Sequence, residues 1–451
     1  MPVTYDSAVE NLLALGHELT TNRKFDLAHM RRLAEALGNP QRKLPSVLIA
    51  GTNGKGSTAA TLASIGEAAG YRTGLYTSPH LVRVNERIQI NHEQISDAEF
   101  ATIYDRVEAM AHELVERSEL PWHPSFFEML TAMAFEYFAS AGVELAVLEV
   151  GLGGRLDATN ISDPCISIIT DIDFDHQMFL GNTLPEIARE KAGIIRPKGT
   201  VVLLPQHPVV NETLGTEIMA REAHAVSAVK YVPPLTPGAD YELPGSAGRN
   251  TFPLAVMGEE ITADFPLAGR HQLRNLALAI TAAEQLNQCG FRISPKDIEQ
   301  GIRMTRWPAR FQVIPAEEEL PEVVLDVAHN PAGAWALRSA LSTFYEDRPL
   351  TFIFGSMRDK AINEIADILF PLADRVIAAQ ADNPRAASPE EIAEHGKHTQ
   401  TDVLLAQSVQ AALDRARELA GKGGVIVITG SIYIVGEALS ILSRKPAGQG
   451  V

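Results

Sequence analysis

The sequence predicts an α/β protein: a domain that contains a phosphate-binding loop, followed by a smaller, Rossmann-like α/β domain. Three observations support this fold class. Short, near-continuous apolar runs such as residues 145–150 recur along the chain, each leads into a polar or glycine-rich turn, and a helical pattern follows. Strands of that kind are typical of a parallel sheet covered by helices on both faces. The recurrence therefore predicts doubly wound sheets that bind ligands at the carboxyl ends of their strands.

Length and charge limit what the chain can be. Its 451 residues are too many for one ordinary core, so we expect two domains, 1–305 and 306–451. The net charge of −17, from 39 basic and 56 acidic residues, argues against nucleic-acid binding and against an anionic membrane surface. We therefore expect small-molecule substrates and a monomer.

The cysteines and the N-terminal residues indicate in which cellular compartment the protein is expected. Only two cysteines occur, Cys165 and Cys289, and they form no C-x-x-C pattern, which argues against a disulfide framework and a thiolate metal site. The first residues lack the basic and apolar regions of a signal peptide, and no apolar run approaches membrane-spanning length. These features predict a cytoplasmic protein with no membrane partner.

The expected elements follow one another in order. A helical pattern spans residues 7–38 and is stopped by Gly-Asn-Pro at 38–40. The other elements expected in the first domain are strands 47–50, 73–76, 145–150, 165–170 and 201–204 and helices 97–119, 125–141, 184–195 and 270–289. The Pro- and Gly-rich stretch 231–268 predicts irregular structure or a small antiparallel addition. A second series begins after residues 305–310, with expected strands 323–326, 350–355, 376–378 and 425–430 and helices between them.

A glycine-rich loop between a strand and a helix is the strongest single signal. Backbone N–H groups and the helix dipole at such a loop bind phosphate, Lys55 adds a charge for terminal phosphates, and Ser57 or Thr58 offers a hydroxyl to Mg²⁺. The loop departs from G-x-x-x-x-G-K-[ST] because Gly56 separates the lysine from the hydroxyl; the plainer alternative is a connecting turn. The candidate phosphate-binding residues are Gly51, Thr52, Asn53, Gly54, Lys55, Gly56, Ser57 and Thr58.

Two further strand ends carry candidate Mg²⁺ ligands. Glu149 ends an apolar strand, where a Mg²⁺-binding or water-activating carboxylate belongs, although a solvated glutamate is the alternative. The glycines after it are not a dinucleotide motif, because Leu156 replaces the third glycine. The acids before His176 resemble a calcium loop, but His176 stands where glycine is required, so a cluster of oxygen ligands with one imidazole is the better interpretation.

Three more residues are ambiguous when taken alone. Lys191 stands at a helix end next to an apolar patch, where snorkelling or helix capping is the better explanation. Asp326 and His329 follow a strand and precede a proline-started helix, so they could contact a nucleotide or form a satisfied turn. His-Glu pairs occur without the second histidine of a zinc protease motif.

The motifs together resemble those of the folylpolyglutamate synthase/dihydrofolate synthase branch of the Mur-type, ATP-dependent amide ligases. They occur in order through both expected domains, which makes the match more specific than any one of them. The loop spacing that departs from the common pattern is normal in that family. The matching segments are AGTNGKGS at 50–57, TSPHL at 77–81, NERI at 85–88, FEMLT at 127–131, LEVGLGGRLDATN at 148–160, DH at 175–176, EKAGI at 190–194, GRHQ at 269–272 with Asn275, and LDVAHNP at 325–331.

The resemblance implies a Mur-ligase-like central domain and the following roles. Lys55 and the loop amides would hold the ATP phosphates, with the nucleotide also contacting Asn275, Arg310, Asp326 and His329. One or two Mg²⁺ ions, with room for a monovalent cation, would be held by Ser57, Ser78, Glu149, His176 and Lys191, the lysine as a carbamate. The pterin-bearing substrate would lie near Phe127, Thr131, Arg155 and Asp157. Lys55, Glu149, His176 and Lys191 would be the catalytic residues. Ala309 replaces a usual glycine before Arg310, a departure that leaves the arginine in place.

The implied reaction joins L-glutamate to dihydropteroate, to the γ-carboxylate of a tetrahydrofolate, or to both. ATP would phosphorylate the acceptor carboxylate, and the glutamate amine would displace phosphate from the acyl phosphate. One rival is a Mur ligase that adds an amino acid to a peptidoglycan precursor, but such chains carry an N-terminal domain for which little sequence precedes Gly51. The other rival is a non-enzymatic phosphate-loop nucleotide switch.

Overall fold

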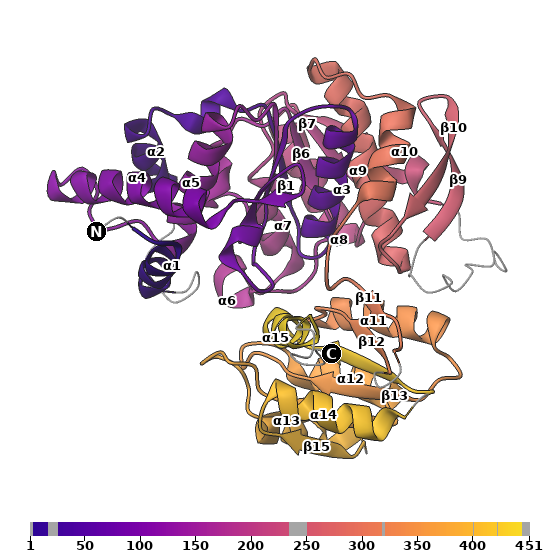
Figure 1. The fold of residues 1–451 in the computed structure, drawn as a ribbon. Coiled ribbons are helices and arrows are strands. Elements are labelled where there is room, and N and C mark those ends of the chain that lie inside the picture. The colour runs from indigo at the N-terminus through magenta and orange to yellow at the C-terminus, as the bar shows by residue number, and fades with distance from the viewer. Residues whose placement is uncertain are drawn as a thin grey trace, which may run out of the picture. The chain divides into compact units, whose positions relative to one another are not determined.

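The structure is a computed structural model that describes residues 3–16, 26–233, 250–317, 321–399, 401–421 and 423–443 (Figure 1). Contacts divide the chain into two units. The first unit ends at Arg306 and the second begins at Trp307, next to the boundary expected from the sequence, but the short stretch Asp264–Gln272 also groups with the second unit. Each unit is described separately below.

The first unit is built on a sheet with the strand order β4-β3-β2-β5-β1-β6-β7-β8. From β2 to β8 the neighbouring strands are parallel, and β3 and β4 add an antiparallel edge. The central strands are buried along their whole length, as the near-continuous apolar runs predict. The strands are β1 (Ser46–Ala50), β2 (Thr73–Tyr76), β3 (Ile88–Ile90), β4 (Glu93–Gln94), β5 (Leu145–Glu149), β6 (Ile166–Ile169), β7 (Thr200–Leu203) and β8 (His224–Ser227).

Helices cover both faces of this sheet (Figure 1). On one face the core joins strand residues such as Leu48 and Leu148 to α1, α2, α4, α5 and α7. On the other face α3 contacts β1, β2 and β5 and packs against α10. The helices of this unit are α1 (Tyr5–Ala14), α2 (Leu27–Ala36), α3 (Lys55–Ala68), α4 (Asp97–Glu116), α5 (Phe126–Ser140), α6 (Gln177–Leu180), α7 (Leu184–Ala192), α8 (Pro208–Ala220), α9 (Arg270–Leu286) and α10 (Pro295–Met304), with 3₁₀ turns η1 (Pro40–Lys43), η2 (Val84–Arg87), η3 (Ala158–Ile161), η4 (Val229–Tyr231) and η5 (Asn287–Cys289).

The expected small addition is a two-stranded sheet of β9 (Asn250–Val256) and β10 (Glu259–Phe265). Two residues, Met257 and Gly258, connect the strands, and so short a connection requires antiparallel pairing. The prediction for 231–268 is therefore confirmed over its described residues, while 234–249 lie outside them. The helical pattern expected over 7–38 corresponds to α1 and α2, with residues 17–25 also outside the described part.

The second unit is a smaller α/β layer structure with the strand order β11-β12-β16-β13-β14-β15. All pairs are parallel except β11 with β12. A core of residues such as Val324, Phe352 and Val427 lies between the sheet and its helices. Its elements are β11 (Gln312–Ile314), β12 (Glu322–Leu325), α11 (Pro331–Phe344), β13 (Leu350–Phe354), α12 (Ile362–Leu369), η6 (Phe370–Leu372), β14 (Arg375–Ala379), α13 (Pro389–Gly396), η7 (Lys397–Thr399), β15 (Val403–Ala406), α14 (Val409–Ala420), β16 (Val425–Thr429) and α15 (Ile432–Leu442).

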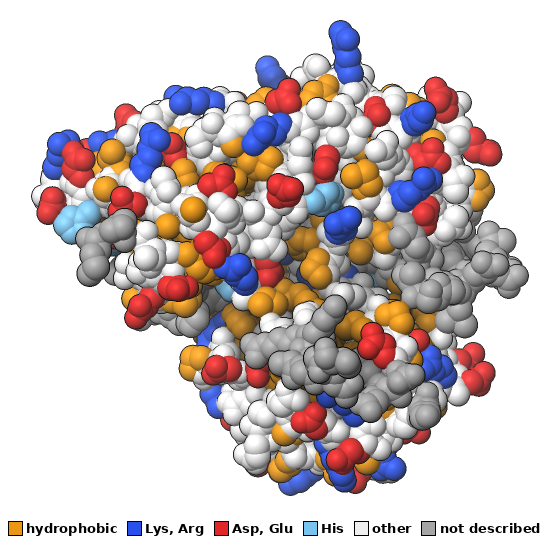
Figure 2. Space-filling view, in the orientation of Figure 1, with side chains coloured by type: hydrophobic (Ala, Val, Ile, Leu, Met, Phe, Trp, Pro, Cys, Tyr) orange, Lys and Arg blue, Asp and Glu red, His pale blue; other side chains and the backbone are white. Residues whose placement is uncertain are grey.

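The surface carries both signs of charge. On the face drawn in Figure 2, basic and acidic side chains are interspersed, and neither gathers into one broad patch. Within the described ranges, no helix combines the length and the apolar character needed to cross a bilayer.

Candidate active site

The topology brings four polar loops to one edge of the first sheet. Strands β2, β5, β1 and β6 are neighbours and all parallel, so their carboxyl ends lie side by side. Ser78 follows β2, Glu149 ends β5, the loop 51–54 follows β1, and residues 170–176 follow β6. This edge is where open α/β sheets bind their ligands.

The phosphate loop is fixed to the segment that follows β6. The backbone N–H groups of Thr52 and Asn53 donate to the Asp171 carbonyl at 2.8 and 3.2 Å. The Thr52 hydroxyl donates to the Asp173 carbonyl at 2.9 Å. Gly54 then opens α3 with a left-handed φ of 88°. The first turn of α3, with its free N–H groups, follows directly, as an anion site requires.

Two glycines of the loop leave no room for a side chain. A Cβ at Gly51 would lie 1.8 Å from the Thr170 hydroxyl, and one at Gly54 would lie 2.2 Å from Asn275 Oδ1. Asn275 of α9 is buried and therefore lies directly against the loop. A sequence separation of more than 200 residues kept this contact out of reach of local sequence reasoning.

The Gly54→Ala variant is expected to lose at least tenfold in nucleotide affinity, because its Cβ would displace Asn275 from the loop. Gly70→Ala is the matched control: Gly70 has a nearly equal φ of 86° but no atom within 4 Å of its Cβ position. Both variants carry a backbone strain of about 1–2 kcal/mol, and thermal unfolding should report a larger loss for Gly54→Ala, whose Cβ also meets buried Asn275. Calorimetric titration with ADP separates them, and equal affinities in the two variants would refute the role of the contact.

Two lysines converge on the loop. Lys55 Nζ donates to the carbonyls of Gly51 and Thr52, both at 3.1 Å. Lys191 Nζ, from the last turn of α7, donates to the same Gly51 carbonyl at 2.6 Å. Lys191 is only 4% exposed, so its ammonium end neither snorkels to solvent nor caps its own helix.

The environment of Lys191 changes its protonation. Burial, followed by the nearby charge of Lys55, lowers the pKa of Lys191 from 10.5 to about 7, although Asp175 and Asp157 oppose the shift. About half of the amine is therefore neutral near neutral pH, whereas an ordinary lysine is almost wholly charged. A neutral amine is a nucleophile, a property that the sequence pattern alone does not reveal.

Glu149 is a buried carboxylate at the same edge. It is 4% exposed and accepts a hydrogen bond from the Ser78 backbone N–H at 3.1 Å. Ser57 and Thr58 are buried in the first turn of α3, and the Thr58 hydroxyl has no hydrogen-bond partner among the described residues. His176 takes a left-handed φ of 49° before α6, and its Nε2 lies 3.7 Å from Asp175 Oδ2.

The donors suit Mg²⁺ shared with phosphate better than a metal cage made by protein alone. Within the described ranges, no three His, Cys, Asp or Glu side chains group as a metal site. Mg²⁺ commonly keeps several waters and takes only one or two carboxylates besides substrate phosphates. One buried carboxylate with hydroxyls beside a phosphate loop fits that requirement, so the residues present are compatible with the ion.

The loop after β5 is organised by Asp157. Its carboxylate accepts from the backbone N–H groups of Leu152 and Thr159 at 2.9 and 3.0 Å. Burial raises the pKa of Asp157 to about 6, against these hydrogen bonds, which lower it. Arg155 is exposed and donates to Glu190 Oε1 at 2.9 Å. Asp157 therefore shapes the loop, while Arg155 lies at its surface.

Phe127 and Thr131 occupy consecutive turns of α5. The Phe127 ring lies against Gly151, where a Cβ would be 2.5 Å from Cζ, and 6.1 Å from the Tyr76 ring. Thr131 is fully buried; its hydroxyl donates to the Phe127 carbonyl at 2.8 Å and is 3.0 Å from the Tyr76 hydroxyl. Thr131 thus supports Phe127 from within the core, and its contact with the substrate stays a prediction.

The second unit places its three candidates at the carboxyl end of β12. Buried Asp326 accepts from the backbone N–H groups of Phe311 and Ala328 at 2.8 and 2.9 Å. Burial raises the pKa of Asp326, while the charge of Arg310 opposes the shift. His329 Nδ1 lies 2.9 Å from the Val327 carbonyl. These contacts bring Arg310, Asp326 and His329 together, and they also form the satisfied turn before α11.

One ion pair of this site was missed by the sequence patterns. Arg274 of α9 donates to both carboxylate oxygens of Asp171, at 2.6 and 3.0 Å. Asp171 also accepts the loop N–H groups of Thr52 and Asn53 through its carbonyl, so the pair ties α9 to the phosphate loop. Arg274 belongs to no local motif. The only indication of its role in the sequence is that it directly precedes the candidate residue Asn275.

Known protein families resemble this chain over parts of both units. Two family models match the chain: the Mur ligase middle domain over residues 123–283, and the Mur ligase, glutamate ligase domain over 309–432. The folylpolyglutamate synthase of Lacticaseibacillus casei is 36% identical over 415 residues, which is 89% of this chain and 91% of that protein.

The chain belongs to the folylpolyglutamate synthase/dihydrofolate synthase family of Mur ligases. The family resemblance and the two-domain α/β fold class predicted from the sequence are thereby confirmed. Folylpolyglutamate synthases are ATP-dependent glutamate ligases. Two archaeal members, bifunctional proteins, are longer, and the chain spans about half of their length.

Two solved members of the folylpolyglutamate synthase family have this fold with ligands bound. The Mycobacterium tuberculosis folylpolyglutamate synthase complexed with ADP and AMPPCP has a TM-score of 0.84 at 33% identity, over 97% of this chain and all of that one. Escherichia coli FolC in complex with DHPP and ADP has a TM-score of 0.79 at 28% identity, over 97% of each chain. Adenine nucleotide binding is thus a property of these relatives.

Proposed function

We propose that this chain joins L-glutamate to dihydropteroate, to the γ-carboxylate of tetrahydrofolates, or to both, with ATP as the phosphoryl donor. One observation carries the proposal. The phosphate loop, the buried carboxylate Glu149 and the low-pKa amine of Lys191 meet at one edge of the sheet in a member of the glutamate-ligase family. A phosphate loop alone would fit a kinase or a switch equally well.

The reaction balances as two displacements. A carboxylate oxygen of the acceptor attacks the γ-phosphorus of ATP, and ADP leaves, which gives an acyl phosphate. The glutamate amine then attacks the acyl carbon, the amide bond forms, and phosphate leaves with one oxygen of the original carboxylate while the amine loses a proton. Such catalysis consists mainly of positioning and charge stabilisation.

The nucleotide is assigned to the phosphate loop and Asn275 in the first unit and to three residues of the second unit. The loop amides and Lys55, which now donates to loop carbonyls, would turn to the phosphates when they enter. Asn275 is supported by its contact with Gly54. We also assign Arg310, Asp326 and His329 to the nucleotide, on the basis of their cluster at the end of β12.

Mg²⁺ is assigned to Ser57, Ser78, Glu149, His176 and Lys191. When bound with the phosphates, Mg²⁺ offsets the negative charge of the transferring group. The protein contributes a buried carboxylate that is already oriented by the Ser78 N–H. It also contributes Lys191, which we propose to act as a carbamate: the neutral amine attacks CO₂, an N–C bond forms, a proton leaves to solvent, and a cation becomes a carboxylate-like ligand.

The pterin-bearing substrate is assigned to the surface between α5 and the loop after β5. Phe127 offers a ring for stacking beside Gly151. Arg155 offers a cation at the exposed rim of the loop, Asp157 holds the loop in shape, and Thr131 supports Phe127 from below.

The activity is tested by following ADP and phosphate release with each substrate left out in turn. We expect release only when ATP, L-glutamate and either dihydropteroate or a reduced folate are all present; each acceptor offered separately shows which of the two ligations occurs. Release that is independent of both acceptors, from a folded protein, would contradict the proposal and favour a nucleotide switch. We propose a cytoplasmic monomer; light scattering with the purified chain tests its oligomeric state.

A further inference from the structure

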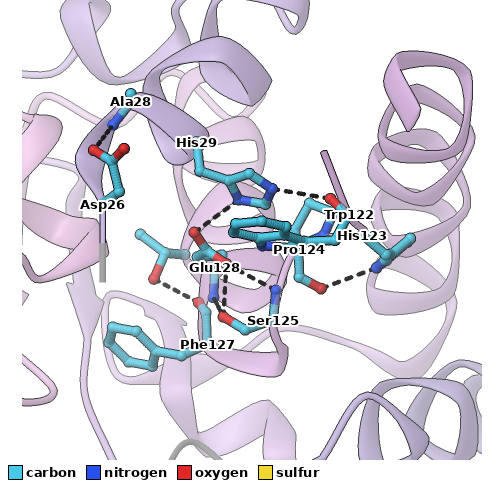
Figure 3. A network of polar contacts seen from close by, with 10 residues as sticks. Asp26, Ala28, His29, Trp122, His123, Pro124, Ser125, Phe127 and Glu128 are labelled. Carbon is cyan, nitrogen blue, oxygen red and sulfur yellow. Dashed lines mark hydrogen bonds and ion pairs between the residues drawn. The ribbon is translucent and has the colours of Figure 1, made fainter. Parts of the chain in front are cut away.

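The residues before α5 are held by a histidine from another helix (Figure 3). His29 lies on α2, and its Nδ1 is 3.0 Å from Glu128 Oε1 while its Nε2 is 2.9 Å from the Trp122 carbonyl. A carbonyl oxygen can only accept, so Nε2 carries a proton. An ionised carboxylate also only accepts, so the ionisation state of Glu128 decides whether the ring carries a second proton, on Nδ1.

Glu128 is ionised in this network. Burial acts to raise the pKa of Glu128, but the hydrogen bond and charge of His29 and the Ser125 hydrogen bonds outweigh it, and the net pKa is lowered. Ser125 donates to Glu128 Oε2 through both its N–H and its hydroxyl at 2.8 Å. With both partners accepting, buried His29 donates twice and is an imidazolium ion.

A second histidine in the same segment has the same pattern of partners. His123 Nδ1 is 2.9 Å from the Pro124 carbonyl, and its Nε2 is 3.0 Å from Glu108 Oε2 on α4. The hydrogen bond with Glu108 raises the pKa of His123 above its ordinary value, although burial opposes the shift. Residues 122–125 are thus bonded to α2 and α4 by two rings that must both be charged to make all their contacts.

The charged groups that face these rings favour protonation. Glu128 on α5 faces both histidines, and Glu108 on α4 faces His123. Two cations follow His29 on α2: Arg31, two residues on, and Arg32, which is bound to Glu119 and Glu35. Loss of either ring proton would leave one acceptor without its donor, which costs more at buried His29 than at half-buried His123.

The segment leads directly into the proposed substrate surface. Trp122 is 41% exposed and stacks on His29 with 5.7 Å between ring centroids. Phe127 follows Ser125 by two residues and lies against Gly151. Movement of residues 122–125 would therefore shift the start of α5 and the Phe127 ring.

We propose that His29 and His123 are positioning residues for the acceptor substrate: as imidazolium ions they hold residues 122–125, and with them Phe127, in the binding geometry, so that acceptor affinity falls as the solution becomes alkaline. This inference rests on the proposed role of Phe127. The sign follows from the bonds: the protonated rings make four hydrogen bonds, and each deprotonation removes one. At the acid end the network persists until Glu128 is protonated, below its ordinary pKa range.

The test compares KM values between about pH 6 and pH 9. In the natural chain, KM for dihydropteroate should rise roughly tenfold with pH, while KM for ATP changes little. His29→Gln and His123→Gln should show the raised KM at every pH. His29→Arg and His123→Arg keep the positive charge and should hold KM low into the alkaline range. His112→Gln, at an exposed histidine of α4, is the matched control and should behave as the natural chain.

A second readout does not depend on turnover. In a Trp307→Phe/Trp335→Phe background, Trp122 is the remaining tryptophan, and its fluorescence should rise as the stacked imidazolium of His29 loses its proton. The rise should be absent in His29→Arg. If no acceptor is turned over but the fluorescence titration appears, the proposed function fails and the charged network stands. A pH-independent acceptor KM, or glutamine variants with the natural KM, would overturn the inference.

Discussion

Replacing Lys191 with alanine is expected to abolish ligation, with kcat reduced by about 10³-fold or more, while the chain still folds. The loss follows because the variant removes the amine that we propose to become a Mg²⁺-binding carbamate, a change in transition-state charge worth several kcal/mol. The fold is retained because a buried amine with a lowered pKa is itself costly to bury. Lys198→Ala, at a largely exposed lysine, is the matched control and should keep full activity.

Two further measurements identify the role of Lys191. Carbon-13 NMR with labelled bicarbonate should show one lysine carbamate signal that grows as pH rises through about 7 and is missing in Lys191→Ala. Small carboxylic acids should partly restore activity to the variant, because they can occupy the space of the carbamate. Full activity of Lys191→Ala would remove the residue from the site.

When Lys191 is not carbamylated, the free energy of unfolding should show a characteristic dependence on pH. The folded chain releases the Lys191 proton near pH 7, whereas the unfolded chain keeps it up to about 10.5. The unfolded state binds more protons between these values, so this group makes the free energy of unfolding increase with pH across that window. The contribution should be absent in Lys191→Ala, as denaturant unfolding in CO₂-free buffers would reveal.

Glu149→Gln is expected to lower kcat by about 10²–10³-fold and to raise the Mg²⁺ concentration needed for half-maximal rate. Glutamine keeps the shape of the side chain, and its carbonyl oxygen can still accept from the Ser78 N–H, so only the charge is lost. Steady-state rates over a range of Mg²⁺ concentrations measure both effects.

The same strand supplies a matched control for Glu149. Glu144 immediately precedes β5 and accepts the Arg72 N–H at 2.9 Å, but it stands at the opposite end of the strand from the site. Glu144→Gln should therefore leave both kcat and the Mg²⁺ dependence unchanged. Equal losses in the two variants would indicate a general effect on β5 instead of a role for Glu149 in the reaction.

Local patterns were sufficient for the central strands of both sheets and for the phosphate loop. The apolar runs at 145–150 and 165–170 became the buried parallel strands β5 and β6, because a strand covered on both faces must be apolar throughout. The strand-loop-helix at 47–58 needed no long-range information. The antiparallel edge formed by β3 and β4 was not predicted, since strands of two or three residues carry little periodicity.

Contacts between distant segments were out of reach of the patterns. The position of Lys191 against the Gly51 carbonyl depends on how α7 packs, and the helix-end pattern alone favoured snorkelling. The Asp171–Arg274 pair joins residues 103 positions apart, and no spacing rule connects them. The bonds of Thr131 to the Phe127 carbonyl and with the Tyr76 hydroxyl inside the core were likewise not predicted from its place on a helix.

The central claim is that the phosphate loop serves an acyl-phosphate ligase, and oxygen-isotope transfer tests it most directly. Dihydropteroate labelled with ¹⁸O in its glutamate-accepting carboxylate is incubated with the purified chain, ATP, Mg²⁺ and L-glutamate, and the inorganic phosphate is analysed by mass spectrometry. The account predicts one ¹⁸O atom in each phosphate released and a product heavier by one glutamyl residue. Unlabelled phosphate released alongside the glutamylated product would contradict it.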